Sequence, residues 1–214
     1  MSQTSLPNDP TGFRMPSFTP DVIDLLVGIE PGSSLDTIRA ARQQARDNAQ
    51  ASYVALFEPT EVEHVSLAER FALATFVTGL HKQDAELSYY RRNLKRADEA
   101  LVAKVEAEIS NGLAEGPTGA YPAGPLSAED TPGPGYTPAD AAALGPRLAA
   151  AFTHAHMLVF HPRDASNKAI GALLAAGWSS TGIVTLSQLV AFLAFQLRVI
   201  HGLRVLSRNL AQKH

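Results

Sequence analysis

Six prolines alternate with glycines between Gly112 and Pro138, and this stretch constrains the fold more than any other feature of the chain. The prolines are Pro117, Pro122, Pro125, Pro132, Pro134 and Pro138. Neither a helix nor a central strand tolerates such a run, because proline lacks the backbone N–H that both structures use. We therefore expect an irregular linker over residues 112–137. It would divide the chain into an N-terminal half, 19–111, and a C-terminal half, 138–214, with an extended arm over residues 1–18.

Both halves are predicted to be helical. Apolar residues recur at helical spacing, and helix start signals precede several of these segments, such as the capping box of Ser66 and Glu69 and the Thr137-Pro138 pair. The predicted helices cover 20–26, 34–57, 67–80, 84–110, 138–160, 165–176 and 180–207, and Gly177 ends the sixth. No segment alternates with a period of two, so no strands are expected. The fold class is all-α.

Cysteine is absent from the sequence, and this excludes disulfides, thiolate metal sites and thiol redox chemistry. The net charge of −3 gives no bulk attraction to nucleic acid or to an anionic membrane. The apolar stretch 183–200 is interrupted by polar side chains, which favours a helix buried on most of its circumference over a membrane span. The polar N-terminus lacks the pattern of a signal peptide, so a cytoplasmic protein is expected.

An internal similarity links the two halves. The segment 67–71 (LAERF) is similar to 148–152 (LAAAF), and His81-Lys82-Gln83-Asp84-Ala85 is similar to His161-Pro162-Arg163-Asp164-Ala165. Both copies have a helix, an H-x-x-D-A segment and another helix. This pattern predicts two related helical hairpin units that pack as one bundle.

The C-terminal half resembles a known family. The turn 175–179 (AAGWS), followed by the apolar helix 183–199, is similar to the C-terminal part of the alkylhydroperoxidase-like domain, which belongs to the carboxymuconolactone decarboxylase superfamily. The resemblance covers 144–206 and, more weakly, 66–95. It is strongest to the two-copy, peroxidase-related members, and it implies an all-helical fold that assembles into oligomers through its helices.

The family's redox members carry E-x11-C-x2-C-x3-H, in which a helix N-terminus lowers the pKa of the thiol. Here the segment H-x-x-D stands where the resemblance would place C-x-x-C. A thiol peroxidase is therefore excluded unless a partner supplies the sulfur. One hypothesis is a structural or partner subunit, which forms a homo-oligomer through the 183–206 helix or pairs with a cysteine-containing relative. The other is a cysteine-independent acid–base enzyme of the decarboxylase or lyase type. Its candidate residues are Glu69, His81, Asp84, His161, Arg163 and Asp164.

Two further interpretations concern acidic and histidine side chains. Asp84 and Asp164 are favoured as helix N-caps, which would occupy their carboxylates in backbone hydrogen bonds. His154 and His156 are two residues apart, so on a helix their side chains point about 200° apart and cannot share one ion. No cofactor and no metal site is predicted.

Overall fold

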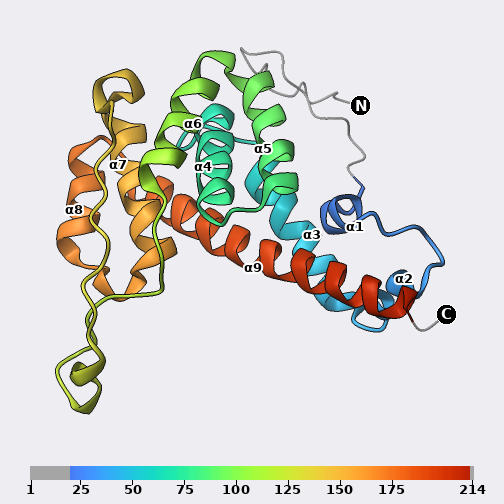
Figure 1. Ribbon diagram of the computed structural model, residues 1–214. Coiled ribbons are helices and arrows are strands. Elements are labelled where there is room, and N and C mark those ends of the chain that lie inside the picture. Colours follow the sequence, from blue (N-terminus) through green and yellow to red (C-terminus); the bar gives the residue numbers. More distant parts are fainter. Residues whose placement is uncertain (1–19, 213–214) are drawn as a thin grey trace, which may run out of the picture.

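The computed structural model describes residues 20–212, and over that range the protein is built from nine α-helices and two short 3-10 helices, with no strand (Figure 1). The predicted all-α fold is confirmed. The predicted arm over residues 1–18 lies outside the described residues. In order along the sequence the elements are α1 (Val22–Val27), α2 (Ser34–Ala40), α3 (Gln43–Phe57), α4 (Leu67–Leu80), α5 (Asp84–Ala97), α6 (Glu99–Gly112), η1 (Pro125–Glu129), α7 (Ala141–Phe160), η2 (Pro162–Asp164), α8 (Asn167–Ala175) and α9 (Ser180–Ala211).

α4 is the central helix. Its residues from Arg70 to Leu80 are all buried, and it packs against α5, α6, α7 and α9. Phe76 of α4 stacks on Phe152 of α7 with ring centroids 4.4 Å apart. The predicted capping box begins the helix, since the Ser66 hydroxyl accepts from the Glu69 N–H and the Glu69 carboxylate accepts from the Ser66 N–H. A helix that is apolar around its whole circumference is buried on every side, and α4 follows this rule.

α9 has 32 residues. It crosses one side of the bundle from α8 toward α1 and α3 (Figure 1). Ile183, Leu186 and Leu193 belong to its buried face, whereas Val184 and Phe195 are exposed on the other side. Among the described residues it is the one helix that is long and apolar enough to cross a membrane by length and composition, and half of its most apolar stretch is buried inside the protein.

Two predicted long helices are broken in the structure. The segment 34–57 is interrupted at Ala41 and Arg42, between α2 and α3. The segment 84–110 is interrupted at Asp98, whose extended backbone ends α5 while its side chain accepts from the Ala100 N–H and caps α6. The predicted start at Thr137-Pro138 is also wrong, because Asp140 caps α7 through the Ala143 N–H. Local capping by Asp98 and Asp140 overrides helical periodicity at the starts of α6 and α7.

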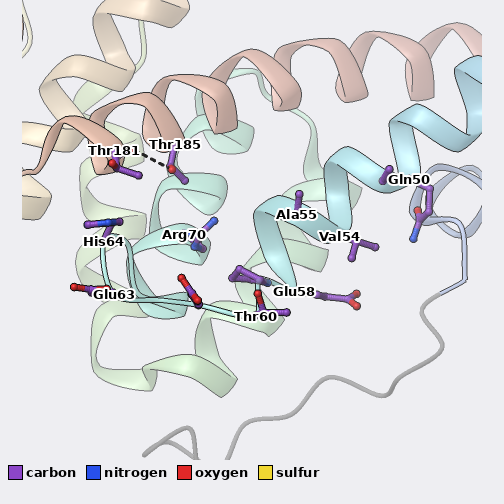
Figure 2. A pocket seen from close by; sticks show the side chains of 13 residues that line it. Gln50, Val54, Ala55, Glu58, Thr60, Glu63, His64, Arg70, Thr181 and Thr185 are labelled. Atoms are coloured by element: carbon purple, nitrogen blue, oxygen red, sulfur yellow. Dashed lines mark hydrogen bonds between the residues drawn. The ribbon is translucent and has the colours of Figure 1, made fainter. Parts of the chain in front are cut away.

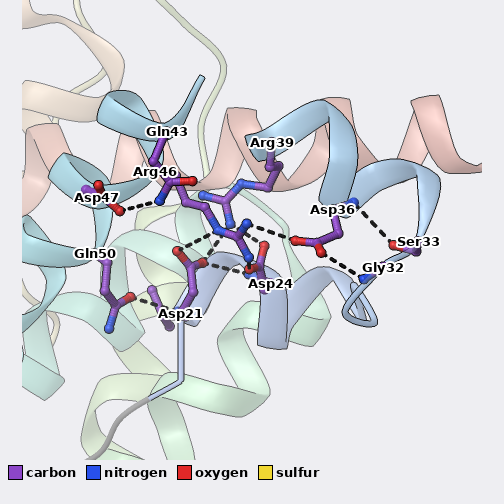
Figure 3. A network of polar contacts seen from close by, with 11 residues as sticks. Asp21, Asp24, Gly32, Ser33, Asp36, Arg39, Gln43, Arg46, Asp47 and Gln50 are labelled. Carbon is purple, nitrogen blue, oxygen red and sulfur yellow. Dashed lines mark hydrogen bonds and ion pairs between the residues drawn. The ribbon is translucent and has the colours of Figure 1, made fainter. Parts of the chain in front are cut away.

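A network of charged side chains fixes α1 and α2 against α3 (Figure 3). The buried Arg39 guanidinium donates to Asp21 at 2.7 Å and also pairs with Asp24. Arg46 pairs with Asp24 and, at 2.8 Å, with Asp36. The cations alternate with carboxylates across three short elements. This alternation compensates the charges that burial brings together.

The linker forms a hairpin whose tip, η1, projects away from the helices (Figure 1). Gly119 and Thr131 pair as an isolated antiparallel bridge. The base of the hairpin is attached to the end of α7, where the Thr118 N–H donates to the Phe160 carbonyl at 2.8 Å. Instead of crossing the surface as a free connection, the linker therefore closes over one edge of the C-terminal half.

Candidate active site

A cavity of about 430 Å³ lies between the linker, α7 and α8. Its walls combine small or apolar side chains with imidazoles and one carboxylate. The lining residues are Pro134, Gly135, Tyr136, Ala150, Thr153, His154, His156, Met157, His161, Asp164, Ala169 and Ala172. Most pockets that bind small molecules share this composition of apolar walls with a few polar groups.

His161 and Asp164 form a hydrogen-bonded pair in this cavity. The His161 Nδ1 atom lies 2.9 Å from the Asp164 Oδ2 atom. α7 ends at His161, Pro162 opens the 3-10 helix η2, and the Asp164 N–H donates to the His161 carbonyl. In a 3-10 turn, residues three apart lie one above the other, so this turn brings the two side chains together.

The Asp164 carboxylate is held by a second contact from the linker. Its Oδ1 atom accepts from the Ala120 N–H at 3.1 Å. This backbone hydrogen bond and the bond from His161 lower the pKa of Asp164. Gly133 lies so close that a Cβ there would be 2.5 Å from Asp164 Oδ2 and 2.8 Å from the His161 ring. An ionised carboxylate can only accept, so this contact favours the tautomer of His161 that carries its proton on Nδ1 and its lone pair on Nε2.

His154 and His156 line the same cavity and are buried. Among residues 20–212, no three histidine, aspartate or glutamate side chains are placed so that they could hold one metal ion. His154 Nε2 lies 3.3 Å from the Ser187 hydroxyl, and His156 Nε2 lies 3.0 Å from the Gly112 carbonyl. Burial lowers the pKa of His154, and it lowers the pKa of His156 to about 4. Both rings are therefore neutral at pH 7.

Tyr136 brings the linker into the wall of the cavity. Its ring stacks on the His156 ring with centroids 4.6 Å apart. Its hydroxyl donates to Glu108 at 2.9 Å, and burial together with this carboxylate raises the pKa of Tyr136. Glu108 also accepts from the Asp140 N–H at 3.1 Å. Sequence reasoning missed Tyr136, His156 and Glu108 as site residues, because they come from three segments that only the tertiary fold brings together.

The acidic residues of the H-x-x-D segments are not helix caps, so this prediction is wrong. Ser166 caps α8 through the Ala169 N–H, and Asp164 lies outside that helix. Asp84 is exposed in the first turn of α5, where Gln83 occupies the N-cap position. The third residue of the second segment, Arg163, does not line the cavity, because it donates to the Thr118 carbonyl at 3.2 Å and its guanidinium lies over the Tyr121 ring.

The candidate residues of the N-terminal half are not brought together. Glu69 begins α4, where it completes the capping box and pairs with Arg147 at 2.8 Å. His81 follows the last residue of the same helix, about 18 Å away along the helix axis. Its Nε2 atom is buried without a hydrogen-bond partner, and burial and the charge of Arg198 lower its pKa. Of the six candidates, His161 and Asp164 alone share a cavity.

No protein-family model, no curated protein and no solved structure matches this protein.

Proposed function

We propose that this protein is a cysteine-independent acid–base enzyme, with His161 as the general base and Asp164 as the residue that orients it. The observation that carries the proposal is the 2.9 Å contact between His161 and Asp164 in the wall of a 430 Å³ cavity. A carboxylate that accepts the Nδ1–H of histidine fixes the tautomer with a bare Nε2 atom. It also stabilises the imidazolium that forms when Nε2 takes up a proton.

The reaction is a proton transfer. The Nε2 lone pair of His161 takes a proton from a C–H or O–H group of the substrate, and the C–H or O–H bonding electrons remain on the substrate. The imidazolium then returns the proton to the same or a neighbouring atom, which requires no co-reactant. Asp164 stays ionised throughout.

The cavity indicates the class of substrate. No lysine or arginine lines it, and Arg163 is held outside by Thr118 and Tyr121. His154 and His156 are neutral, and the remaining walls are formed largely by alanine, methionine and proline side chains. A small, uncharged and largely apolar carbon acid fits these walls better than an anion, which would find no counter-charge.

The test uses a panel of small ketones, esters and lactones incubated with the protein in D2O. NMR would follow the replacement of α-protons by deuterium. The wild-type protein should accelerate exchange for at least one compound, and His161→Gln and Asp164→Asn should lower that rate by at least about a hundredfold. The matched control Arg163→Gln should exchange like the wild type. Exchange that persists in His161→Gln, or no exchange with any compound, would contradict the proposal.

A second role is supported by α9. Val184, Phe195 and Val205 are exposed at 56%, 47% and 40% on this helix. Apolar side chains in contact with water favour association, and we propose that α9 binds a second copy of the protein or a cysteine-containing relative, in keeping with the resemblance to the alkylhydroperoxidase-like family. Light scattering at micromolar concentration should report a dimer or larger species, and Phe195→Ser should lower the mass. A wild-type monomer would refute this role.

A further inference from the structure

A second cavity of about 650 Å³ lies on another side of the molecule (Figure 2). Its walls come from the C-terminal half of α3, the loop between α3 and α4, and the first turns of α9. None of the residues of the His161 cavity takes part in it. The two cavities are therefore separate.

Arg70 of α4 is the unusual residue of this cavity. Its side chain lines the cavity, although the residue is only 6% exposed. The Nε atom donates to the Val65 carbonyl at 3.0 Å and the Nη1 atom donates to the Leu56 carbonyl at 2.7 Å. The third nitrogen, Nη2, forms no hydrogen bond within residues 20–212. It is also not one of the side-chain atoms of these residues that are buried without a partner. It is thus the guanidinium nitrogen left for the cavity.

The charge of Arg70 has no ion-pair partner among the described residues. The charge of its neighbour Glu69 acts on it, but that carboxylate is already bonded to Ser66 and Arg147. Burial lowers the pKa of Arg70, which means that the folded protein bears a cost for keeping this group charged. Buried cations are normally paired with an acid, and an Arg that binds two neutral carbonyls leaves room for an anion.

Two features of α9 add to the attraction for an anion. The first turn of this 32-residue helix faces the cavity, and the amide end of a long helix carries partial positive charge. The hydroxyl of Thr181 forms no hydrogen bond within the described part of the protein, so it can donate to a ligand. Thr185 differs, because its hydroxyl donates to the Thr181 carbonyl at 3.0 Å and can only accept a further bond.

The loop that follows α3 contributes carboxylates to the cavity wall, and Glu58 is one of them. Glu61 and Glu63 are exposed on the loop before α4 and line the rim. The cavity therefore has a positive inner wall, formed by Arg70 and the start of α9, and a negative rim. A simple anion would satisfy the inner wall alone, whereas a molecule with a carboxylate at one end and an ammonium group at the other satisfies both.

We propose that this cavity binds a small zwitterion of the amino-acid type. Its carboxylate accepts from Arg70 and Thr181, and its ammonium group faces Glu61 and Glu63. Val54, Ala51 and Ala55 of α3 also line the cavity and would contact the methylene groups of the ligand. Arginine suits the inner position because its guanidinium matches the geometry of a carboxylate.

Isothermal titration of the full-length protein with three matched probes tests this proposal. The probes are 6-aminohexanoate, hexanoate and hexylamine. We expect 6-aminohexanoate to bind most tightly, hexanoate more weakly and hexylamine not measurably. Tightest binding of hexylamine, or no binding of any probe, would overturn the proposal.

Substitutions in the cavity test which residues bind the carboxylate and which bind the ammonium group of the ligand. Arg70→Gln keeps a donor for one carbonyl and should weaken binding of 6-aminohexanoate at least about thirtyfold, as removal of one partner of a buried charge pair does. If Arg70→Gln does not fold, Thr181→Val decides, and it should weaken binding of both carboxylates severalfold. The double variant Glu61→Gln/Glu63→Gln should abolish the advantage of 6-aminohexanoate over hexanoate. Arg163→Gln is the matched control, because Arg163 lines neither cavity. Unchanged binding in Arg70→Gln, or in Thr181→Val, overturns the assignment.

Discussion

The two H-x-x-D segments have the same end residues at the same spacing, yet they place the histidine and the aspartate differently. After His81, Lys82 takes a left-handed conformation with φ 56°, and Asp84 becomes the exposed first residue of α5. After His161, Pro162 opens a 3-10 turn that brings Asp164 to 2.9 Å from the imidazole. The two intervening residues decide the geometry, because they set whether the backbone turns tightly or opens into a new helix.

The surroundings of the two histidines differ as well. His81 follows the fully buried α4, and its Nε2 atom is enclosed without a partner. His161 lies at the edge of the bundle, in the wall of a cavity closed by the linker. The Nε2 atom of the histidine is thus enclosed in one half, whereas in the other half the histidine ring lines a cavity.

The largest expected effect is a loss of folding stability at acid pH, and it tests the burial of the neutral histidines. A buried histidine with a lowered pKa stays neutral while the unfolded protein takes up a proton below pH 6.5. Stability should therefore fall between pH 6.5 and about 4, where His156 titrates in the folded protein, by about 1–3 kcal/mol for this residue. Urea unfolding at pH 7 and pH 5 measures it. His156→Gln should flatten this dependence, whereas a wild-type stability equal at both pH values would contradict the burial of neutral rings.

An effect of similar size tests the tight packing of the N-terminal half. A Cβ at Gly79 of α4 would lie 2.5 Å from the Ile109 Cδ1 atom and 2.7 Å from both of its Cγ atoms. Gly79→Ala should therefore destabilise the protein by about 1–3 kcal/mol, because a β-branched side chain adjusts poorly. In the C-terminal half, a Cβ at Gly171 of α8 meets nothing within 4 Å. Gly171→Ala should stabilise by about 0.5–1 kcal/mol. Thermal melts that give both variants the same sign would remove the contrast between the halves.

The smallest expected effect on stability comes from a comparison of Asp164 with Asp84. Asp164→Ala removes the acceptor of the Ala120 N–H and should lower the melting temperature and speed proteolysis of the linker. Asp164→Asn keeps an acceptor for that N–H and should have a milder effect on both readouts. Asp84→Ala should melt close to the wild type, because Asp84 is exposed and does not cap α5. Equal losses in the two alanine variants would indicate that the segments are equivalent after all.

Local signals in the sequence predicted much of the fold. The Ser66 capping box, the turn at Gly177 and the Pro/Gly-rich linker each depend on residues within a few positions of one another. The interruption at Asp98 had such a signal too, since an aspartate followed by glutamate is typical of a helix start. The helical periodicity did not reveal this interruption, because the apolar spacing continues across the break.

Sequence reasoning predicted only those residues of the candidate site that are close to one another in the sequence. His161 and Asp164 belong to one short turn, so their residue types and spacing already suggested a pair. Tyr136 and Glu108 reach the same site from the linker and from α6, and no spacing in the sequence indicates that contact. The cap assigned to Asp164 was wrong for a related reason, because Ser166 competes for the helix start two residues later. The paired arrangement of two related hairpin units stays a prediction.

The tautomer of His161 decides whether the cavity contains a general base. Long-range ¹H–¹⁵N NMR spectra, recorded at a pH where the ring is neutral, distinguish the protonated from the bare ring nitrogen. We predict a proton on Nδ1, shared with Asp164, and a bare Nε2 atom facing the cavity, with this preference lost in Asp164→Asn. His156, which donates from Nε2 to the Gly112 carbonyl, should show the opposite tautomer in the same spectrum. A proton on Nε2 of neutral His161 would leave no base in the cavity and would contradict the proposed function.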